Sequence, residues 1–396
     1  MIVEQQQDLG RVLLALAEEL DISPAQYEEA VRRYEAVGDW LAAEDSTLAV
    51  YDPEVCPQGS FRLGTVTKPV DAQDEYDIDL VCQLAIAKDD ITKEELKRMV
   101  GDRLKEHGVY SRMLDDEKRR CWTLSYEDRK FHIDILPAIP EEGGPPNSIL
   151  ITDKKLRNWL HSNPKNFAEW FRSRMAAMFD RRRRCIAEAL RASVEDVPEW
   201  QVKTPLQRAV QLLKRHRDIR FNGDKDDKPA SIIITTLAAH AYDDEEDLLH
   251  LFLDLPRRMR DHVKRINGFY SIPNPADPRE DFADRWREHP QRAKKFFAWL
   301  ETMENDLKSA LAQPSPKKLL KRLTDAFGGA SLRAVFRRLG LPADTVPARA
   351  TPEHMSKLRD AFDRKNVGLA ATGQSVVVAS EAKVAPVITK PWATTH

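Results

Sequence analysis

The 396-residue sequence lacks the patterns expected of a membrane protein, a secreted protein or a general nucleic-acid-binding protein. No run approaches the roughly 18 to 20 apolar residues that a membrane span needs, and the first residues lack the basic segment and apolar core of a secretion signal. Lys and Arg number 62 against 64 Asp and Glu, so the net charge of −2 predicts no general coat for nucleic acid. Any basic surface must therefore be local.

Cysteine is scarce as well. The four Cys residues are widely spaced, with no CxxC pair and no Cys/His cluster at the spacing of zinc ligands. This pattern indicates a reducing, intracellular compartment. We therefore expect a soluble, cytoplasmic protein with no membrane association.

Four regions follow one another along the chain, and together they predict an α+β fold. Residues 1–47 are predicted to form two N-terminal helices that pack on the core, and residues 48–150 alternate short strands with a helix, typical of a mixed sheet with flanking helices. A stretch rich in Pro and Gly ends this region. Residues 151–365 are predicted to be all-α, and residues 366–396 form a tail rich in Ala, Val and Thr.

Helical patterns in the second half cover residues 203–221, 229–243, 245–270, 290–312 and 316–338. Residues 232–236 are β-branched enough to resemble a strand. Because the apolar pattern continues through residues 237–242, we predict a helix that begins near Ser231. A helix N-terminus at Ser231 would suit an anion.

The strand predicted at residues 76–83, YDIDLVCQ, carries two carboxylates, Asp77 and Asp79, separated by one residue. Because side chains alternate along a strand, both aspartates point to one face and the apolar residues point to the other. Two carboxylates this close repel each other unless a cation lies between them. The strand therefore predicts a site for a divalent metal.

A third carboxylate, Asp134, lies in the strand predicted at residues 131–140, FHIDILPAIP. If this strand pairs beside the first, Asp134 joins Asp77 and Asp79. Three such ligands suit two Mg²⁺ ions, or Mn²⁺, which would hold a nucleoside triphosphate and lower the pKa of an attacking hydroxyl. Asp134 is also placed to act as general base toward that hydroxyl.

Other residues could take part in this site. Asp128 or the pair Asp115 and Asp116 could supply the third carboxylate instead of Asp134, although an unpaired carboxylate within a buried strand such as residues 131–140 would be costly. His132 shares the predicted face of Asp134, and we interpret it as a structural histidine.

A turn at Gly59 and Ser60 precedes the first carboxylate strand. Glycine permits the backbone to approach a phosphate closely, and a serine hydroxyl can hydrogen-bond a phosphate oxygen. Arg62 and Lys68 nearby could neutralise phosphate charge, although most such residues are surface charges. The turn is thus a candidate phosphate-binding element.

These motifs resemble a known family. The stretches QGSFRLGT, DEYDIDLV, FHIDILPAIP, TPLQRAVQLLKRHRD and KPASIIITTLAAHA, within about residues 58–241, are similar to the DNA polymerase β-like nucleotidyltransferases. Within these they resemble the cGAS/DncV-like enzymes (CD-NTases) of bacterial anti-phage CBASS systems. The resemblance implies a bilobed enzyme, in which a nucleotidyltransferase core is backed by a long N-terminal helix and a helical lobe closes the cleft.

The resemblance also implies roles for individual residues. Gln58, Gly59 and Ser60 match the phosphate-binding turn, and Asp77, Asp79 and Asp134 match the catalytic metal ligands. Lys214 and Ser231 match positions that contact the donor triphosphate.

The implied product is a cyclic di- or trinucleotide made from ATP, GTP or related triphosphates. No zinc-binding insert like that of the animal DNA sensors is visible in the sequence, so activation by DNA is not expected.

Two other functions fit the same motifs. One is a linear nucleotidyltransferase that acts on RNA, a protein or a small molecule, although the near-neutral charge disfavours the basic groove that RNA would need. The other is a catalytically silent module that binds a nucleotide. The low-charge tail at residues 366–396 is the predicted docking element for a regulatory protein partner.

Overall fold

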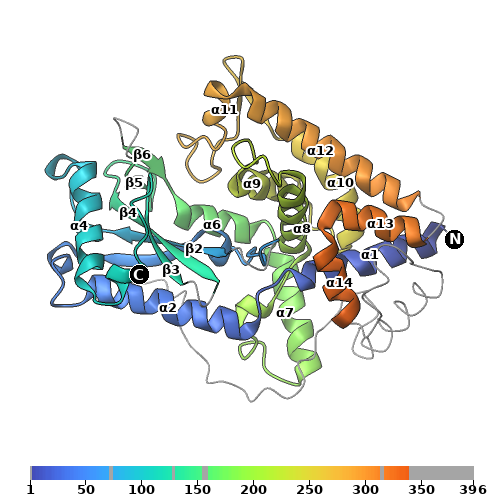
Figure 1. The fold of residues 1–396 in the computed structure, drawn as a ribbon, viewed down its shortest axis with the longest axis horizontal. Helices are drawn as coiled ribbons and strands as arrows, with labels where there is room; N and C mark the ends of the chain where they lie inside the picture. The colour runs from blue at the N-terminus through green and yellow to red at the C-terminus, as the bar shows by residue number, and fades with distance from the viewer. Residues whose placement is uncertain (1, 71–74, 127–129, 154–158, 313–315, 339–396) are drawn as a thin grey trace.

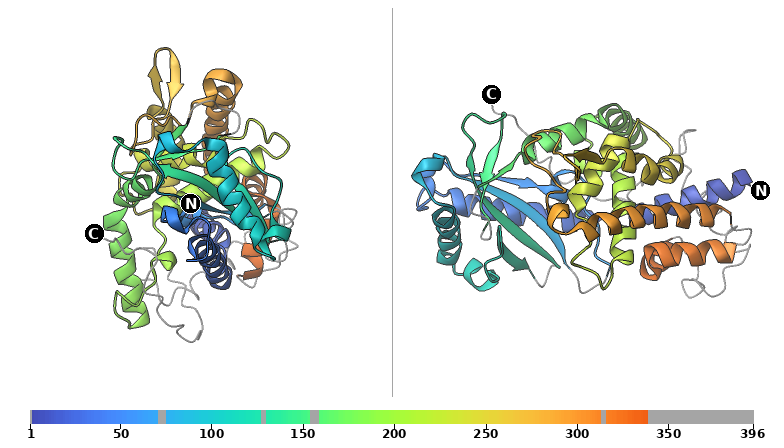
Figure 2. Two further views of the ribbon diagram at one scale, coloured as in Figure 1. Left: turned by 90° about the vertical axis from the view of Figure 1, so that its left-hand side faces the viewer. Right: turned by 90° about the horizontal axis from the view of Figure 1, so that it is seen from above.

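The computed structural model describes residues 2–70, 75–126, 130–153, 159–312 and 316–338. In these residues the chain forms two lobes that lie side by side, one built around a β-sheet and one built of helices (Figures 1 and 2). None of the helices in the described ranges is long and apolar enough to cross a membrane. The predicted tail at residues 366–396 lies outside the described residues.

The main sheet consists of β1 (Glu54–Gln58), β2 (Tyr76–Gln83), β3 (Trp122–Tyr126), β4 (Phe131–Pro140), β5 (Ile149–Ile151) and β6 (Leu160–Ser162). The strands lie in the order β1-β2-β4-β5-β6, and β3 pairs with the first half of β4. β2 and β4 are parallel, and the other pairs are antiparallel. The sheet thus continues past residue 150, the predicted boundary of the core. The sequence did not show this, because β5 and β6 are too short to display an alternating pattern.

Two helices, α2 (Pro24–Ala42) and α4 (Lys93–Glu106), cover one face of the sheet. Ile78 and Leu80 of β2 are fully buried in this core together with Val37 of α2 and Val100 of α4. Because side chains alternate along β2, burial of its apolar residues places the two aspartates on the opposite face. The start of α2 is fixed by a capping box on Ser23, as the Ser-Pro sequence predicts.

The helical lobe contains α1 (Ile2–Glu19), α6 (Pro164–Ser173), α7 (Ala176–Leu190), α8 (Pro205–Arg220), α9 (Ser231–Ala241), α10 (Leu248–Asp261), α11 (Arg285–Glu288), α12 (Pro290–Leu311), α13 (Pro316–Phe327) and α14 (Gly329–Arg338). Two short helices, α3 (Gly59–Arg62) and α5 (Tyr110–Met113), lie in the sheet lobe. α8 is buried along most of its length, from Pro205 to Arg217. α8 is therefore surrounded by the other helices of this lobe on one side and by the sheet lobe on the other.

Two expectations about this lobe are wrong. α1 was expected to pack on the sheet lobe with α2, but its apolar residues, among them Leu9, Leu13 and Leu16, join the core formed by α8 and α10. The range 245–270 was expected to be helical, but α10 ends at Asp261 and a hairpin follows, formed by β7 (Lys264–Ile266) and β8 (Phe269–Ser271). Asn267 and Gly268 join these strands with φ angles of 52° and 83°, the conformation of a tight hairpin turn.

Candidate active site

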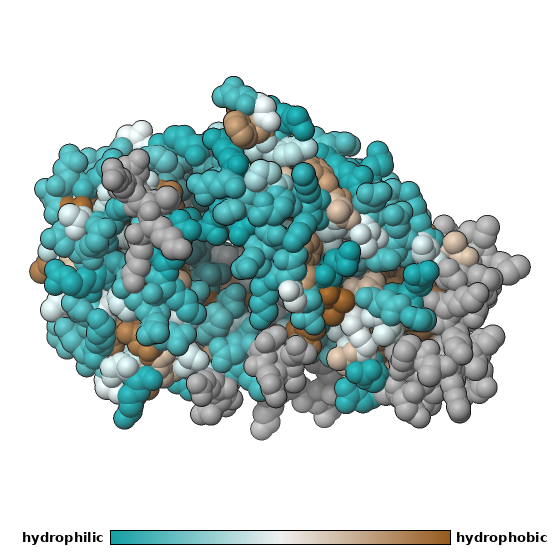
Figure 3. All heavy atoms as spheres, turned by 45° about the horizontal axis from the view of Figure 1, so that its top comes forward, coloured by the Kyte–Doolittle hydropathy of each residue, from teal (hydrophilic) through white to brown (hydrophobic). Residues whose placement is uncertain are grey.

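The predicted pairing of the two carboxylate strands is confirmed. In the parallel ladder between β2 and β4, Asp79 lies opposite Asp134 and Asp77 lies opposite His132. Asp77 and Asp79 line a cavity of about 780 Å³ between the sheet and helices α8 and α9. In the space-filling view the surface is hollowed between the two lobes (Figure 3).

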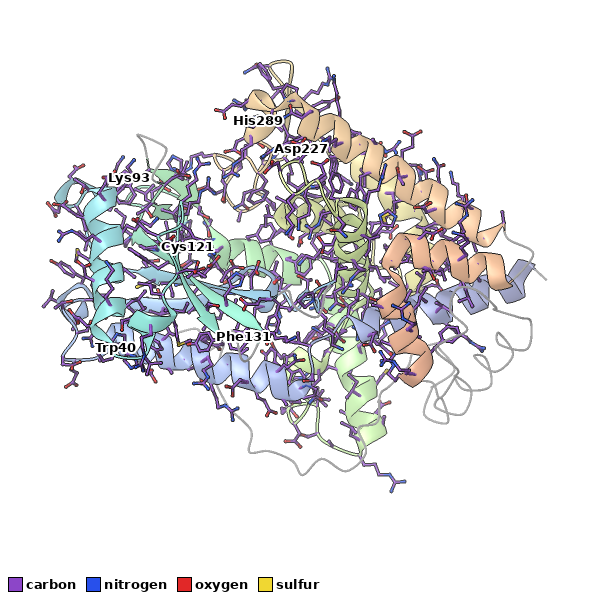
Figure 4. All side chains as sticks on the ribbon, viewed as in Figure 1. Trp40, Lys93, Cys121, Phe131, Asp227 and His289 are labelled. Atoms are coloured by element: carbon purple, nitrogen blue, oxygen red, sulfur yellow. The ribbon has the colours of Figure 1, made fainter. Side chains whose placement is uncertain are left out.

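Asp134 is held from the neighbouring strand. Thr123 of β3 lies opposite Asp134 in the antiparallel ladder, is 1% exposed, and donates its hydroxyl to Asp134 Oδ1. Burial and the nearby charge of Asp134 raise the pKa of Cys121, which lies just before β3 and is labelled on the sheet lobe in Figure 4. The Asp134 carboxyl is thus held by the hydroxyl of Thr123.

Mutual repulsion and burial shape the electrostatics of this cluster. Burial raises the pKa of Asp79 to about 7, and the charges of Asp77 and Asp134 add to this rise. Burial also raises the pKa of Asp77, and His132 opposes the shift. In the described part of the chain, no three His, Cys, Asp or Glu side chains are close enough together to hold a metal. A divalent cation nevertheless fits the donor set, because it would remove the repulsion that raises these pKa values.

The predicted Gly-Ser turn lies directly against this cluster. β1 ends at Gln58, which pairs with Asp79 of β2, and α3 begins at Gly59. Gly59 has a φ angle of 62°, and a Cβ atom at this position would clash with Asp79 Oδ2. Only glycine fits here, so the backbone of the turn and the carboxylate are in contact. Ser60, the next residue, lines the cavity.

The helical lobe supplies the cationic wall of the cavity. Lys214 of α8 donates from Nζ to the carbonyl and the hydroxyl of Thr65, at 3.0 and 3.2 Å. Burial lowers the pKa of Lys214 to about 7. Ser231 is the first residue of α9, and its hydroxyl accepts a hydrogen bond of 2.9 Å from Arg217 Nη1. Both predicted donor contacts, Lys214 and Ser231, therefore lie at the cavity.

α8 also holds the backbone that follows the turn. Side chains of α8 and of Lys203, just before it, donate to five carbonyls after the turn: Gln207 to Leu63, Lys203 to Gly64, Lys214 to Thr65, Gln211 to Val66 and Arg215 to Lys68. The distances are between 2.7 and 3.0 Å. We call this set of hydrogen bonds the α8 ladder. Through it the phosphate-binding turn of the sheet lobe is attached to the helical lobe.

Several cavity residues were interpreted differently or missed. His132 was interpreted as structural, but it lines the cavity, and its Nε2 lies 3.2 Å from Asp77 Oδ1. Its place on the face of Asp134 was the signal in the sequence. Lys225 and Lys228 also line the cavity, from a loop that carries no periodic pattern.

Asp134 lies opposite Asp79 in the sheet but is outside the set of described residues that line the cavity. Asp115 lines the cavity but lies outside the two paired strands. Asp128 lies outside the described residues. The assignment of Asp134 as the third ligand stays a prediction, and it is supported by the position of Asp134 opposite Asp79.

Comparison with known proteins is consistent with this geometry. A family model described as the nucleotidyltransferase domain of cyclic GMP-AMP synthase DncV-like proteins matches residues 53–137. The chain is 31% identical over 308 residues to a c-di-GMP synthase of Roseivirga ehrenbergii, covering 76% of this chain and 80% of that protein. It is 29% identical over 357 residues to the cyclic dinucleotide synthase CdnG of Bradyrhizobium diazoefficiens, covering 84% of each.

The fold agrees over most of the chain. The structure of Bradyrhizobium diazoefficiens CdnG in complex with GTP matches with a TM-score of 0.69 and 26% identity, covering 83% of this chain and 96% of that one. The match includes both lobes, because it extends far beyond the sheet. With the long sequence similarity and the carboxylates in register on β2 and β4, these findings show that the chain belongs to the cGAS/DncV-like nucleotidyltransferase family.

Proposed function

We propose that this protein is a cyclic dinucleotide synthase that uses GTP. Two relatives carry names of this activity, one of them for cyclic di-GMP, and the matched CdnG structure contains GTP. The family resemblance implied either a cyclic dinucleotide or a cyclic trinucleotide, and we propose the dinucleotide. ATP and the other ribonucleoside triphosphates remain candidate second substrates.

One observation carries the proposal: the glycine of the phosphate-binding turn touches the carboxylate of Asp79, which in turn lies opposite Asp134. Phosphate and metal would therefore meet at one point of the cavity. Asp77, Asp79 and Asp134 would hold magnesium or manganese, which when bound neutralises the triphosphate and lowers the pKa of the attacking hydroxyl.

The remaining chemistry falls to the chain's own side chains. Ser60, Lys214 and Ser231 bind the donor triphosphate, and a polyanion there favours the protonated form of Lys214, whose pKa lies near 7. Asp134 accepts the proton of the acceptor hydroxyl. Each transfer forms one bond between that oxygen and an α-phosphorus and releases one pyrophosphate. A second transfer in the same cavity closes the ring.

A product assay tests the proposal. The protein is incubated with Mg²⁺ and each triphosphate, alone and in pairs, and the phosphatase-resistant products are identified by mass spectrometry. We expect cyclic di-GMP from GTP, and no product from the Asp77→Asn/Asp79→Asn variant. Products that remain linear would instead assign a linear transferase, and GTP binding without turnover would assign a silent binding module.

We also propose a cellular role. The family resemblance supports a cytoplasmic enzyme of anti-phage defence, whose product acts as a second messenger. Cells carrying the wild-type gene should survive phage infection better than cells carrying the double Asn variant. Truncation before residue 366 tests whether a protein partner acts through the tail, and the product assay with and without added DNA tests whether DNA is required.

A further inference from the structure

The loop between α8 and α9, residues 222–230, divides its charges between two neighbours. Asp224 and Asp227 face α12, where Lys295 Nζ lies 2.7 Å from an oxygen of each. Arg292 of α12 lies 3.6 Å from the other oxygen of Asp227. Figure 4 shows Asp227 on this loop, beneath the start of α12 and across the gap from the sheet. The two aspartates thus fasten the loop to α12.

The two lysines of the loop have a different environment. Lys225 and Lys228 both line the cavity that Asp77 and Asp79 also line. Lys228 Nζ lies 3.3 Å from Asp218, and its side chain is 38% exposed. Both lysines follow an aspartate directly, so fastening the aspartates to α12 orients the lysines toward the cavity.

A lysine at this position differs from Lys214. Lys214 is 4% exposed and makes two hydrogen bonds to Thr65, whereas Lys228 is partly solvated and has one longer ion pair. Lys228 and Asp77 line the same cavity. A compact, solvated cation on a flexible stem suits a phosphate group that must bind and then leave.

We propose that Lys225 and Lys228 form a subsite for the pyrophosphate leaving group, and that Lys295 positions them through Asp224 and Asp227. The assignment rests on the proposed nucleotidyl transfer, in which the bond from the α-phosphorus to its bridging oxygen breaks and the electron pair stays on pyrophosphate. No other reactant is needed. The two lysines lie six and three residues before Ser231, on the side of the cavity that we assign to the donor triphosphate.

The test measures pyrophosphate binding directly, so it needs no cyclic product. Isothermal titration of the full chain with pyrophosphate and Mg²⁺ compares wild type with Lys225→Met/Lys228→Met. We expect binding about tenfold weaker or more in the variant, since two partly exposed charge-assisted contacts are lost. The control is Lys321→Met on α13, which removes a lysine that is 65% exposed, has an ion pair of 2.9 Å to Asp325 and lies outside the set of residues that line the cavity.

Lys295 provides the second arm. Lys295→Met should weaken pyrophosphate binding because the loop is released, and Lys295→Arg should restore it by keeping the ion pairs. Turnover assays should show a raised KM for GTP and weaker product inhibition by pyrophosphate in the lysine variants. Unchanged pyrophosphate affinity in Lys225→Met/Lys228→Met would overturn the assignment. If the proposed function failed, no cyclic product would form, but the binding difference would persist.

Discussion

The two walls of the cavity differ in how fully their charges are satisfied by the protein. On the sheet wall, Asp79 is partly buried and repelled by Asp77 and Asp134, and the pKa values of Asp77 and Asp79 are both raised. On the helical wall, Lys214 and Arg217 already donate to protein acceptors such as Thr65. The sheet wall therefore needs a cation, whereas the helical wall offers cations that a phosphate must share with the protein. Each experiment below removes or tunes one wall.

The largest effect is expected for Asp79→Asn. Loss of a metal-binding carboxylate should reduce nucleotidyl transfer by about a thousandfold or more. The same change should raise Tm without metal at pH 8 by on the order of a few degrees. The reason is that the folded-state pKa of about 7 exceeds the ordinary value of 3.8, so folding disfavours ionised Asp79, and stability falls as pH rises through that window.

Thermal melts of Asp79→Asn and of Asp325→Asn, a half-exposed aspartate on α13, would check the stability effect. A lower Tm for Asp79→Asn than for wild type would contradict the claim that ionised Asp79 destabilises the folded protein.

On the helical wall, Lys214→Met should reduce kcat/KM for GTP by about a hundredfold, because one buried charge contact to the triphosphate is lost. Lys203 is the matched control: burial lowers its pKa to about 8, and it donates to the Gly64 carbonyl at 2.8 Å, but it is outside the set of residues that line the cavity. Lys203→Met should lower Tm but leave kcat/KM close to that of the wild type. Equal kinetic losses in both variants would mean that Lys214 acts only through the α8 ladder.

The proton balance of Mg²⁺ binding sharpens the comparison. Because the pKa of Asp79 is about 7, this carboxyl carries a proton in much of the population at pH 6 and must lose it to bind metal. Mg²⁺ affinity should thus rise by about fivefold between pH 6 and pH 7 and by about tenfold between pH 6 and pH 8, and level off above pH 8. Isothermal titration in buffers of different ionisation enthalpy would count the released protons. Asp79→Asn should abolish this release, and equal release in both proteins would assign it elsewhere.

The smallest effect is expected at Thr123. Replacing it with Val removes the hydrogen bond to Asp134 Oδ1 and leaves the carboxylate freer to turn, which should lower kcat about fivefold. Thr123→Ser keeps a hydroxyl and should recover most of the rate. Both kcat and Tm are measured for the two variants. A lower kcat in Thr123→Val at a Tm equal to that of Thr123→Ser would show that Thr123 positions Asp134, whereas a lower kcat in parallel with a lower Tm would show that it only stabilises the fold.

The sheet wall could be predicted from the sequence further than the helical wall. Period-two alternation places Asp77 and Asp79 on one face, and the apolar flanks of Asp134 predicted a strand that does pair with theirs. The helices that carry Lys214 and Ser231 were also predicted with nearly correct bounds. The hydrophobic pattern predicts each helix or strand, but it does not predict which of them pack against each other in the folded protein.

The missed features follow from that limit. Lys225 and Lys228 lie in a loop, where no period reports the direction of a side chain, and their orientation depends on Lys295 about 70 residues later. α1 has an apolar stripe that would suit either lobe, and only its packing on α8 and α10 decides between them. The contact of His132 with Asp77 could not be predicted, because it depends on the register between two strands that are far apart in the sequence.

The α8 ladder limits how this protein can be recombined with its relatives. Five carbonyls between Leu63 and Lys68 accept hydrogen bonds from five side chains between Lys203 and Arg215, although the two segments are far apart in the chain. A chimera that exchanged the helical lobe alone would leave buried carbonyls without donors, at about 1 to 3 kcal/mol for each group. A functional chimera must therefore take residues 58–69 and 203–215 from the same parent protein, although they lie in two separate parts of the sequence.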